Sequence, residues 1–325
     1  MALDAGAVAA LDCGTNSTRL LIVDGHGKVL VREMRITRLG EAVDSTHKLS
    51  ADAIGRTVSV LGDYKQMMDV HEVTRARLVA TSAARDAVNA DEFFAAAEEV
   101  TGVRPELLTG AEEGRLSFIG ATRSLPAEDR GMQVLVVDIG GGSTELAVGV
   151  TPDDAAGTGP SGPAVAAVSL DLGCVRLTER FFHHDPPLAE ELAQARAMVE
   201  AEVDRARGSL PPLEGPGTLI GLAGTVSTLA ALELELPHYE RDRIHHALLT
   251  RLQVDQWLDR LATEDRRARL QRPGMIEGRA DVIVGGVLVL AVVMARFERT
   301  TCLVSEDDIL DGIAASLLSR DSPVQ

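Results

Sequence analysis

Short apolar runs alternate with amphipathic segments along the whole chain. Residues 7–11 and 20–23 are apolar and flank a turn rich in Gly, Ser and Thr, which predicts two strands joined by that turn. Further strands are expected at 29–35, 77–80, 107–108, 134–137, 146–150, 164–170 and 219–222. Helices are expected at 50–70, from Asn89 or Asp91 to 100, and at 112–121, 188–207 and 282–295, with Ser50 as an N-cap. Strands that alternate with helices are typical of an α/β protein.

An internal near-repeat divides the chain. Residues 12–20 read Asp-Cys-Gly-Thr-Asn-Ser-Thr-Arg-Leu and residues 138–146 read Asp-Ile-Gly-Gly-Gly-Ser-Thr-Glu-Leu, so five of nine positions are identical. Both copies follow one apolar run and precede another, which indicates a duplicated strand–turn–strand unit. We therefore expect a first domain of residues 1–120 with 305–325, and a second domain of residues 121–304.

Composition and charge exclude several classes of function. The 325 residues are 45% hydrophobic and 25% charged, as in a globular protein of about two domains of roughly 150 residues each. The formal net charge of −17 repels nucleic acid and anionic membranes, and 3% aromatic residues make a base-stacking platform a poor fit. The apolar run at 282–295 is too short to span a bilayer. The three cysteines show no metal-ligand spacing, and the N-terminus lacks a basic leader, so we expect a cytoplasmic protein.

The two near-repeat turns have the composition of phosphate-binding loops. Gly, Ser and Thr between two strands leave backbone amides free to form an anion-binding nest, and the hydroxyls add donors. Asp12 and Asp138 open the two loops, and a carboxylate approaches phosphate favourably through a cation such as Mg²⁺. The alternative is that both aspartates only tie down their own turns through side-chain hydrogen bonds.

These motifs resemble those of the exopolyphosphatase and guanosine pentaphosphate phosphohydrolase (Ppx/GppA) family. The similar segments are 12–19, 80–85, 109–115, 137–145, 172–176 and 221–225. The resemblance implies an α/β fold of two actin-like (ribonuclease H-like) domains with an interdomain cleft, as in the actin-like ATPase superfamily. The segment 305–312 departs from the family pattern because Leu310 stands where the family often has Arg. A phosphate contact made by that Arg elsewhere is therefore not expected here.

The resemblance also implies roles for individual residues. Glu113, the second glutamate of a pair, is the expected general base, and Glu112 is expected in the first turn of a helix, where a carboxylate is favourable. Asp138 and Glu145 are expected to be catalytic through Mg²⁺ binding and water positioning. The expected phosphate-binding residues are Asn16, Ser17, Thr18, Arg19, Arg85, Gly140, Gly141, Gly142, Ser143 and Thr144.

The expected reaction is Mg²⁺-dependent release of terminal phosphate from inorganic polyphosphate, with short or medium chains preferred. Guanosine pentaphosphate, a substrate that would connect the protein to the stringent response, is the alternative because both substrates end in the same phosphoanhydride. A non-catalytic sensor of polyphosphate or an alarmone is a second class, and a kinase of sugars or acids is a third. The roles of Arg279 and of the Gly224–Thr225 turn stay open at this stage, as does a homodimer.

Overall fold

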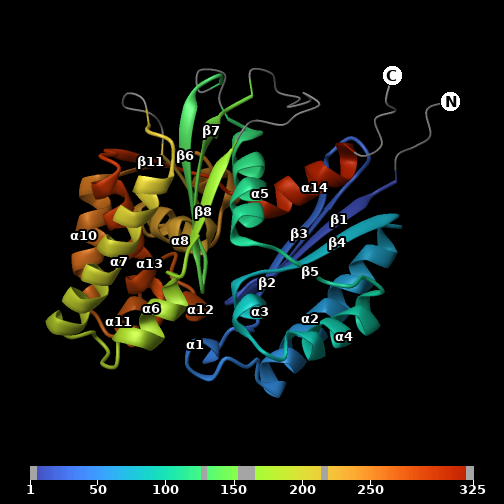
Figure 1. The fold of residues 1–325 in the computed structure, drawn as a ribbon, viewed down its shortest axis with the longest axis horizontal. Coiled ribbons are helices and arrows are strands. Elements are labelled where there is room, and N and C mark those ends of the chain that lie inside the picture. Colours follow the sequence, from blue (N-terminus) through green and yellow to red (C-terminus); the bar gives the residue numbers. More distant parts are fainter. Residues whose placement is uncertain (1–5, 126–129, 153–164, 214–218, 320–325) are drawn as a thin grey trace. The chain divides into compact units, whose positions relative to one another are not determined.

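The chain divides into two compact units (Figure 1). The computed structural model describes residues 6–125, 130–152, 165–213 and 219–319. Unit 1 consists of Met1–Gly120 and Ile309–Gln325, and unit 2 consists of Ala121–Asp308. Residue 164 and parts of the loops expected around 151–163 and 209–217 lie outside the described residues. Within the described ranges, every helix is too short or too polar to cross a membrane.

Unit 1 is built on a five-stranded mixed sheet of order β3-β2-β1-β4-β5. β2 pairs antiparallel with β1 and β3, and β4 pairs parallel with β1 and β5. Its strands are β1 (Val8–Cys13), β2 (Ser17–Val23), β3 (Val29–Ile36), β4 (Arg75–Ala80) and β5 (Glu106–Leu107). Its helices are α1 (Val43–Thr46), α2 (Ala51–Val70), α3 (Ser82–Asp86), α4 (Ala90–Thr101), α5 (Gly110–Thr122) and α14 (Ile309–Ser319).

Each face of the unit 1 sheet packs against its own layer of helices (Figure 1). Leu11 and Ile22 belong to a core cluster with α2 and α4, whereas Val8 and Ala10 pack against apolar residues of α14. Because side chains alternate along a strand, Asp12 follows Val8 and Ala10 onto the α14 face. The expected N-cap is confirmed, since the Ser50 side chain accepts a hydrogen bond from the amide of Ala53 in the first turn of α2.

Unit 2 is built on a six-stranded mixed sheet of order β10-β11-β9-β6-β7-β8. Its strands are β6 (Gln133–Ile139), β7 (Thr144–Val150), β8 (Ala166–Leu170), β9 (Leu219–Leu222), β10 (Leu248–Thr250) and β11 (Thr301–Val304). Its helices are α6 (Cys174–Phe181), α7 (Ala189–Ser209), α8 (Ala223–Glu233), α9 (Arg241–Ile244), α10 (Arg251–Ala262), α11 (Arg266–Arg269), α12 (Glu277–Ala280) and α13 (Ile283–Arg296).

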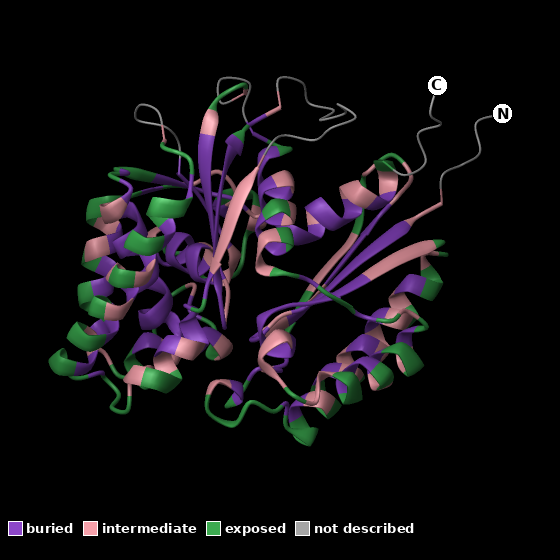
Figure 2. Ribbon diagram, viewed as in Figure 1, coloured by how far each residue is buried: buried purple, intermediate pink, exposed green. Residues whose placement is uncertain are grey.

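A large core cluster of unit 2 lies on one face of this sheet. Leu135, Val137 and Ile139 of β6 belong to a cluster with residues of α7, α8, α10 and α13. The expected apolar helix is α13, which is buried from Ile283 to Met294 (Figure 2). Since side chains alternate along β6, Asp138 projects from the opposite face of the sheet.

The two sheets repeat one topology, which confirms the expected duplication and the α/β fold class. The order of β1 to β5 in the first sheet is repeated in the second by β6, β7, β8, β9 and β11. Each pair of neighbouring strands is parallel or antiparallel as in the first sheet. β10 is an additional edge strand that pairs antiparallel with β11. The register also repeats, because Asp12 lies opposite Arg19 and Asp138 lies opposite Glu145.

The C-terminal return to the first domain begins later than expected. Residues 305–308 belong to unit 2, and unit 1 resumes with α14 at Ile309. The amide of Ser305 donates to the carbonyl of Gly221 at 2.9 Å, and the amide of Glu306 donates to Nδ1 of His245 at 3.0 Å. The first bond continues the β11–β9 pairing past the end of β11, and the second joins the segment to His245 at the end of α9, so residues 305–306 stay attached to unit 2.

Candidate active site

The two glycine-containing loops are closed by the same hydrogen bond. In unit 1 the amide of Gly14 donates to the carbonyl of Ser17 at 3.0 Å, and in unit 2 the amide of Gly140 donates to the carbonyl of Ser143 at 3.0 Å. Each bond links the end of the first strand of its unit to the start of the second. The sequence repeat therefore corresponds to one turn geometry, built twice.

The carbonyl groups of the unit 1 loop are bound by the segment that follows β3. The amides of Thr37 and Arg38 donate to the carbonyl of Asn16, and the amide of Gly40 donates to the carbonyl of Thr15 at 2.9 Å. A Cβ at Gly40 would lie 2.3 Å from Cγ2 of Thr15, so only glycine allows this approach. The loop is thus fixed from one side by backbone contacts.

The unit 2 loop is held in an equivalent way by the segment that follows β8. The amide of Cys174 donates to the carbonyl of Gly140 at 3.0 Å, and the amides of Val175 and Arg176 donate to the carbonyl of Gly141. Nε of Arg176 donates to the carbonyl of Gly142 at 2.7 Å. All three glycine carbonyls are therefore bound by α6 residues.

The glycine of this supporting segment is again required by close packing. A Cβ at Gly173 would lie 2.2 Å from the carbonyl oxygen of Gly141. The pairs Leu39–Gly40 and Leu172–Gly173 stand at matching places, after the third strand of each unit. This second repeat is the sequence signal that would have identified both supporting glycines, and the repeat noted at 12–20 and 138–146 does not include it.

Binding of the loop carbonyls leaves the loop amides as the available polar groups. In the part of the chain that the structure describes, the amides of Gly141, Gly142 and Ser143 donate to no protein acceptor. Successive unoccupied amides in a turn form a concavity of partial positive charge, which is the property of an anion-binding nest. The predicted phosphate-binding residues Gly140–Ser143 thus lie in a loop with this property, although the amide of Gly140 itself closes the turn.

The residues that flank the two loops differ in charge. Across β1 and β2, Arg19 donates to Oδ2 of Asp12 from Nε at 3.0 Å and from Nη2 at 2.6 Å, forming an ion pair. Across β6 and β7, the same register position holds Asp138 and Glu145, both of which are buried. Oε1 of Glu145 accepts a hydrogen bond from Oγ of Ser169, which lies opposite it on β8. Unit 1 therefore has an ion pair where unit 2 has two carboxylates.

The two adjacent glutamates of α5 have different partners. Oε2 of Glu112 accepts hydrogen bonds from the amide of Thr109 at 3.0 Å and from its hydroxyl at 2.8 Å. The amide of Glu112 in turn donates to the hydroxyl oxygen of Thr109, so the two residues form a capping box. The Thr109 amide, as the largest influence, lowers the pKa of Glu112 from its ordinary value. Glu112 is exposed, and its carboxylate serves the start of the helix.

Glu113 pairs with an arginine of a neighbouring helix. It is buried, and its Oε2 accepts a hydrogen bond from Nη1 of Arg85 at 2.7 Å. The same nitrogen of Arg85 donates to the carbonyl of Leu108 at 3.0 Å. Two residues expected in separate roles, the base and a phosphate ligand, are therefore joined in one ion pair.

Two of the expected phosphate ligands direct their hydroxyls into the protein. The hydroxyl of Thr18 lies 2.8 Å from that of Thr37, and the hydroxyl of Thr144 donates to the carbonyl of Leu172 at 2.6 Å. Both threonines are fully buried. Their hydroxyls hold the loops to the supporting segments, so we leave them out of the phosphate site. Asn16 is buried and Ser17 is half-buried in the first loop.

The carboxylates at the second loop fit a magnesium ion better than a metal that requires a closed protein cage. Among the described residues, no group of three or more His, Cys, Asp or Glu side chains could hold a metal ion. Mg²⁺ is commonly bound by one or two carboxylates, with water and phosphate oxygens as its other ligands. Asp138 and Glu145 supply such a pair beside the nest of loop amides.

The structure places Arg279 against the Gly224–Thr225 turn. A Cβ at Gly224 would lie 2.0 Å from Nη2 of Arg279, so the guanidinium group packs directly on this glycine. Arg279 is buried, and its α12 helix precedes α13. Gly286 of α13 is similarly required, because a Cβ there would lie 2.2 Å from Oγ1 of Thr225. The turn and Arg279 thus form one packed unit.

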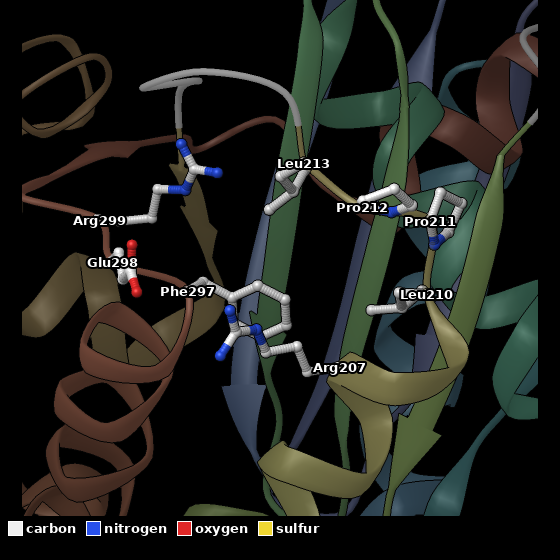
Figure 3. Close-up of a pocket in the computed structure, with 8 residues that line it drawn as sticks. All are labelled: Arg207, Leu210, Pro211, Pro212, Leu213, Phe297, Glu298 and Arg299. Atoms are coloured by element: carbon white, nitrogen blue, oxygen red, sulfur yellow. The ribbon is translucent and has the colours of Figure 1, made fainter.

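A pocket of about 450 Å³ lies in another part of unit 2 (Figure 3). Its lining residues are Arg207, Leu210, Pro211, Pro212, Leu213, Phe297, Glu298 and Arg299. They belong to the segments that precede β9 and β11, whereas Asp138 lies near the carboxyl end of the parallel strand β6. None of the residues expected to bind phosphate or metal lines this pocket, so it is separate from the candidate site.

The comparisons with known proteins identify the family of the chain. The model of the Ppx/GppA phosphatase family matches residues 21–321. Exopolyphosphatase 2 of Mycobacterium tuberculosis is 42% identical over 326 residues, covering 95% of this chain and 98% of that protein. The crystal structure of an exopolyphosphatase-like protein superposes with a TM-score of 0.89 at 34% identity, covering 97% of this chain and 99% of that one. The Ppx/GppA family member of Aquifex aeolicus gives a TM-score of 0.78 at 32% identity, covering 98% and 99%. The chain therefore belongs to the Ppx/GppA phosphatase family.

Proposed function

We propose that the protein is an exopolyphosphatase that hydrolyses the terminal phosphoanhydride bond of inorganic polyphosphate and releases orthophosphate. The observation that carries the proposal is the second loop, where unoccupied amides of Gly141–Ser143 adjoin the carboxylates of Asp138 and Glu145. This combination suits a phosphate group that binds together with a cation. Without the cation, the two carboxylates would repel the phosphate. The 42% identity to an exopolyphosphatase supports polyphosphate as the substrate.

The loops bind and orient the terminal phosphates in this proposal. The amides of Gly141, Gly142 and Ser143 donate to phosphate oxygens, as an anion nest does. In unit 1, Ser17 and Arg19 supply a hydroxyl and a guanidinium group, and Arg19 shares its charge between Asp12 and the substrate. The bound carbonyls keep both loops from reorganising when phosphate binds, so little free energy is lost in ordering them.

Asp138 and Glu145 are the residues that would hold Mg²⁺. The ion would neutralise charge on the terminal phosphates, which is the main requirement for phosphoryl transfer. The hydrogen bond from Ser169 fixes the Glu145 carboxylate in one orientation. That orientation is independent of the substrate because Ser169 lies on the neighbouring strand of the same sheet.

Glu113 acts as the general base. A water molecule attacks the terminal phosphorus, its proton passes to the Glu113 carboxylate, and the bond to the bridging oxygen breaks. The shortened chain leaves with the electron pair of that bond and the terminal group leaves as orthophosphate. Burial of Glu113 limits its contact with bulk water, and its adjacent glutamate is already used at the helix start.

Two other functions predict different outcomes in one experiment. A guanosine pentaphosphate phosphohydrolase shares the terminal chemistry, and a sensor would bind polyphosphate without turnover. Phosphate release should be measured from polyphosphate, guanosine pentaphosphate and ATP, each with Mg²⁺ and with a chelator. We expect the highest kcat/KM with polyphosphate and loss of activity in the chelator.

The matched variants are Asp138→Asn in the site and Asp255→Asn on the surface of α10, where only the first should reduce turnover. A higher kcat/KM for guanosine pentaphosphate would favour the alternative substrate. Tight binding of polyphosphate with no phosphate release would favour the sensor. Either result would reject the exopolyphosphatase assignment.

A further inference from the structure

We infer that Arg85 is a positioning residue for the general base Glu113, and that its main role is to hold this carboxylate rather than to bind substrate phosphate. The inference rests on the proposed function, since it assigns a role within that reaction. It differs from the sequence-based expectation, in which Arg85 contacts phosphate.

The geometry of Arg85 carries this inference. Its Nη1 atom donates to Oε2 of Glu113 at 2.7 Å and to the carbonyl of Leu108 at 3.0 Å. The side chains of Arg85 and Glu113 are 21% and 11% exposed, which places the pair away from bulk water. A charge-assisted hydrogen bond in such surroundings is stronger and more directional than an exposed ion pair.

The backbone around the pair makes Arg85 a link between two structural elements. Arg85 lies in α3, directly after β4, and Leu108 and Glu113 flank the start of α5. The amide of Leu108 donates to the carbonyl of Ala80 at 3.1 Å, and the amide of Glu113 donates to the carbonyl of Thr109 at 3.0 Å. Arg85 thus fixes both the side chain of the base and the peptide from which its helix begins.

A phosphate ligand that bound through Nη1 of Arg85 would have to compete with these contacts. If phosphate withdrew the guanidinium group from Glu113, a buried carboxylate would lose this neutralising cation beside an incoming anion. Removal of one partner from a buried ion pair is costly because the remaining charge keeps its desolvation penalty. The arrangement therefore favours Arg85 as a fixed support for Glu113 during binding and reaction.

Steady-state kinetics of Arg85→Ala on polyphosphate separate the two roles. A displaced base lowers the rate of the chemical step, so we expect kcat to fall about 10²-fold, the scale of a misplacement of roughly 1 Å, while KM changes less than about threefold. The double variant Arg85→Ala/Glu113→Gln should be no slower than Glu113→Gln alone, because residues that act as a unit are not additive. Arg85→Lys should recover part of kcat, since Lys keeps a charged donor.

The opposite pattern would overturn the inference. If Arg85 binds phosphate, Arg85→Ala should raise KM with kcat preserved, and the double variant should be slower than either single variant. Arg104→Ala is the matched control, because Arg104 also pairs with a glutamate, Glu98, but its side chain is 59% exposed. It should leave kcat, KM and the unfolding midpoint unchanged within error.

A second measurement tests the ion pair without turnover. The free energies of unfolding in urea of the wild type, Arg85→Ala, Glu113→Ala and the double variant form a thermodynamic cycle. If the ion pair forms, the double variant loses less stability than the sum of the losses in the two single variants. Additive losses would mean that the pair does not form in solution, and would reject the inference. A wild-type protein that releases no phosphate from polyphosphate rejects the proposed function instead, whereas an active wild type with unaffected Arg85→Ala rejects only the role of Arg85.

Discussion

Asp138 lies directly opposite Glu145 across β6 and β7, in the register position that Asp12 and Arg19 occupy across β1 and β2. In unit 1 the two charges attract and form an ion pair. In unit 2 two buried carboxylates face each other, and like charges directly opposite one another on a sheet are destabilising. A duplicated hairpin has therefore been specialised at one position, and a divalent cation would reverse the repulsion in the second copy.

The first prediction concerns this cation. Asp138→Asn and Glu145→Gln should each raise the Mg²⁺ concentration needed for half-maximal activity, because each removes an anionic oxygen. Mg²⁺ should also raise the melting temperature of the wild-type protein, and it should raise that of either variant less, since a ligand that binds the folded state stabilises it. Titration of Mg²⁺ in phosphate-release and thermal-unfolding assays checks both effects. Undiminished activity in a chelator would show that arginines and loop amides neutralise the substrate without a metal.

The second prediction separates the two glutamates of α5. Glu113→Gln should lower kcat by about 10²–10⁴, the usual range for loss of a general base, without loss of polyphosphate binding. Glu112→Gln should leave kcat within a few-fold, because a glutamine at this capping-box position can still accept from the Thr109 amide. Steady-state kinetics and a binding assay for both variants provide the check. A larger loss of kcat in Glu112→Gln than in Glu113→Gln would mean that Glu112, and not Glu113, is the base.

The sequence was sufficient for the elements whose signals are local. The N-cap of α2 at Ser50 is confirmed because a cap depends on residues within one turn. The duplicated hairpins could also be predicted, since each is a contiguous strand–turn–strand segment. The apolar helix α13 followed from an uninterrupted run of hydrophobic residues.

The partners of the charged side chains could not be predicted, because they come from distant parts of the chain. Arg85 was expected to bind phosphate, but its partner Glu113 lies 28 residues away on another helix. Arg19 pairs with Asp12 through the antiparallel register of two strands, which periodicity alone does not fix. The return of the chain to unit 1 at Ile309, rather than at residue 305, depends on hydrogen bonds that Ser305 and Glu306 make with residues of unit 2.

The third prediction concerns acid stability at the start of α7. Glu191 bonds Nδ1 of His184 and accepts from the amides of Leu188 and His183. These contacts, with His184 as the largest, lower the pKa of Glu191 to about 2. A lowered pKa stabilises the fold at pH values above the ordinary pKa of about 4.5, and this contribution is lost as pH falls towards 2.

Glu191→Gln should therefore melt at a lower temperature than the wild type at pH 5, and the difference should shrink as pH approaches 2. Glu190→Gln is the control, since Glu190 is an exposed neighbour in the same turn. Thermal unfolding from pH 2 to pH 6 checks the trend. A difference that stays constant over this range would show that ionisation of Glu191 contributes nothing to stability.

The fourth prediction concerns the three cysteines, Cys13, Cys174 and Cys302, which are all free thiols in the core. Burial raises the pKa of Cys302 to about 12, and burial also raises the pKa of Cys13 and Cys174. Because the thiolate is the reactive form, a thiol reagent at pH 8 should label the folded protein very slowly and label three thiols after unfolding.

An exposed thiol provides the positive control for that experiment. Ser45 is exposed in α1, so Ser45→Cys should add one fast-reacting group to the folded protein. Rapid labelling of a native cysteine in the wild type would indicate that one of the cores opens readily in solution.

The fifth prediction concerns the length of the polyphosphate chain. The protein carries a net charge of −17, and two arginines expected at the site are already paired with carboxylates, Arg19 with Asp12 and Arg85 with Glu113. Few cationic groups are thus left to bind phosphates beyond the terminal ones, and a long polyanion meets repulsion from the acidic surface.

We expect short and medium chains to be hydrolysed with higher kcat/KM than long chains at low ionic strength. Monovalent salt should narrow the difference, because the Debye length is only about 10 Å at 0.1 M. The measurement is kcat/KM on size-fractionated polyphosphate at two salt concentrations, with free Mg²⁺ held constant. If kcat/KM instead rises steadily to chains of hundreds of phosphates at low salt, a basic track must extend from the site, and the argument from net charge fails.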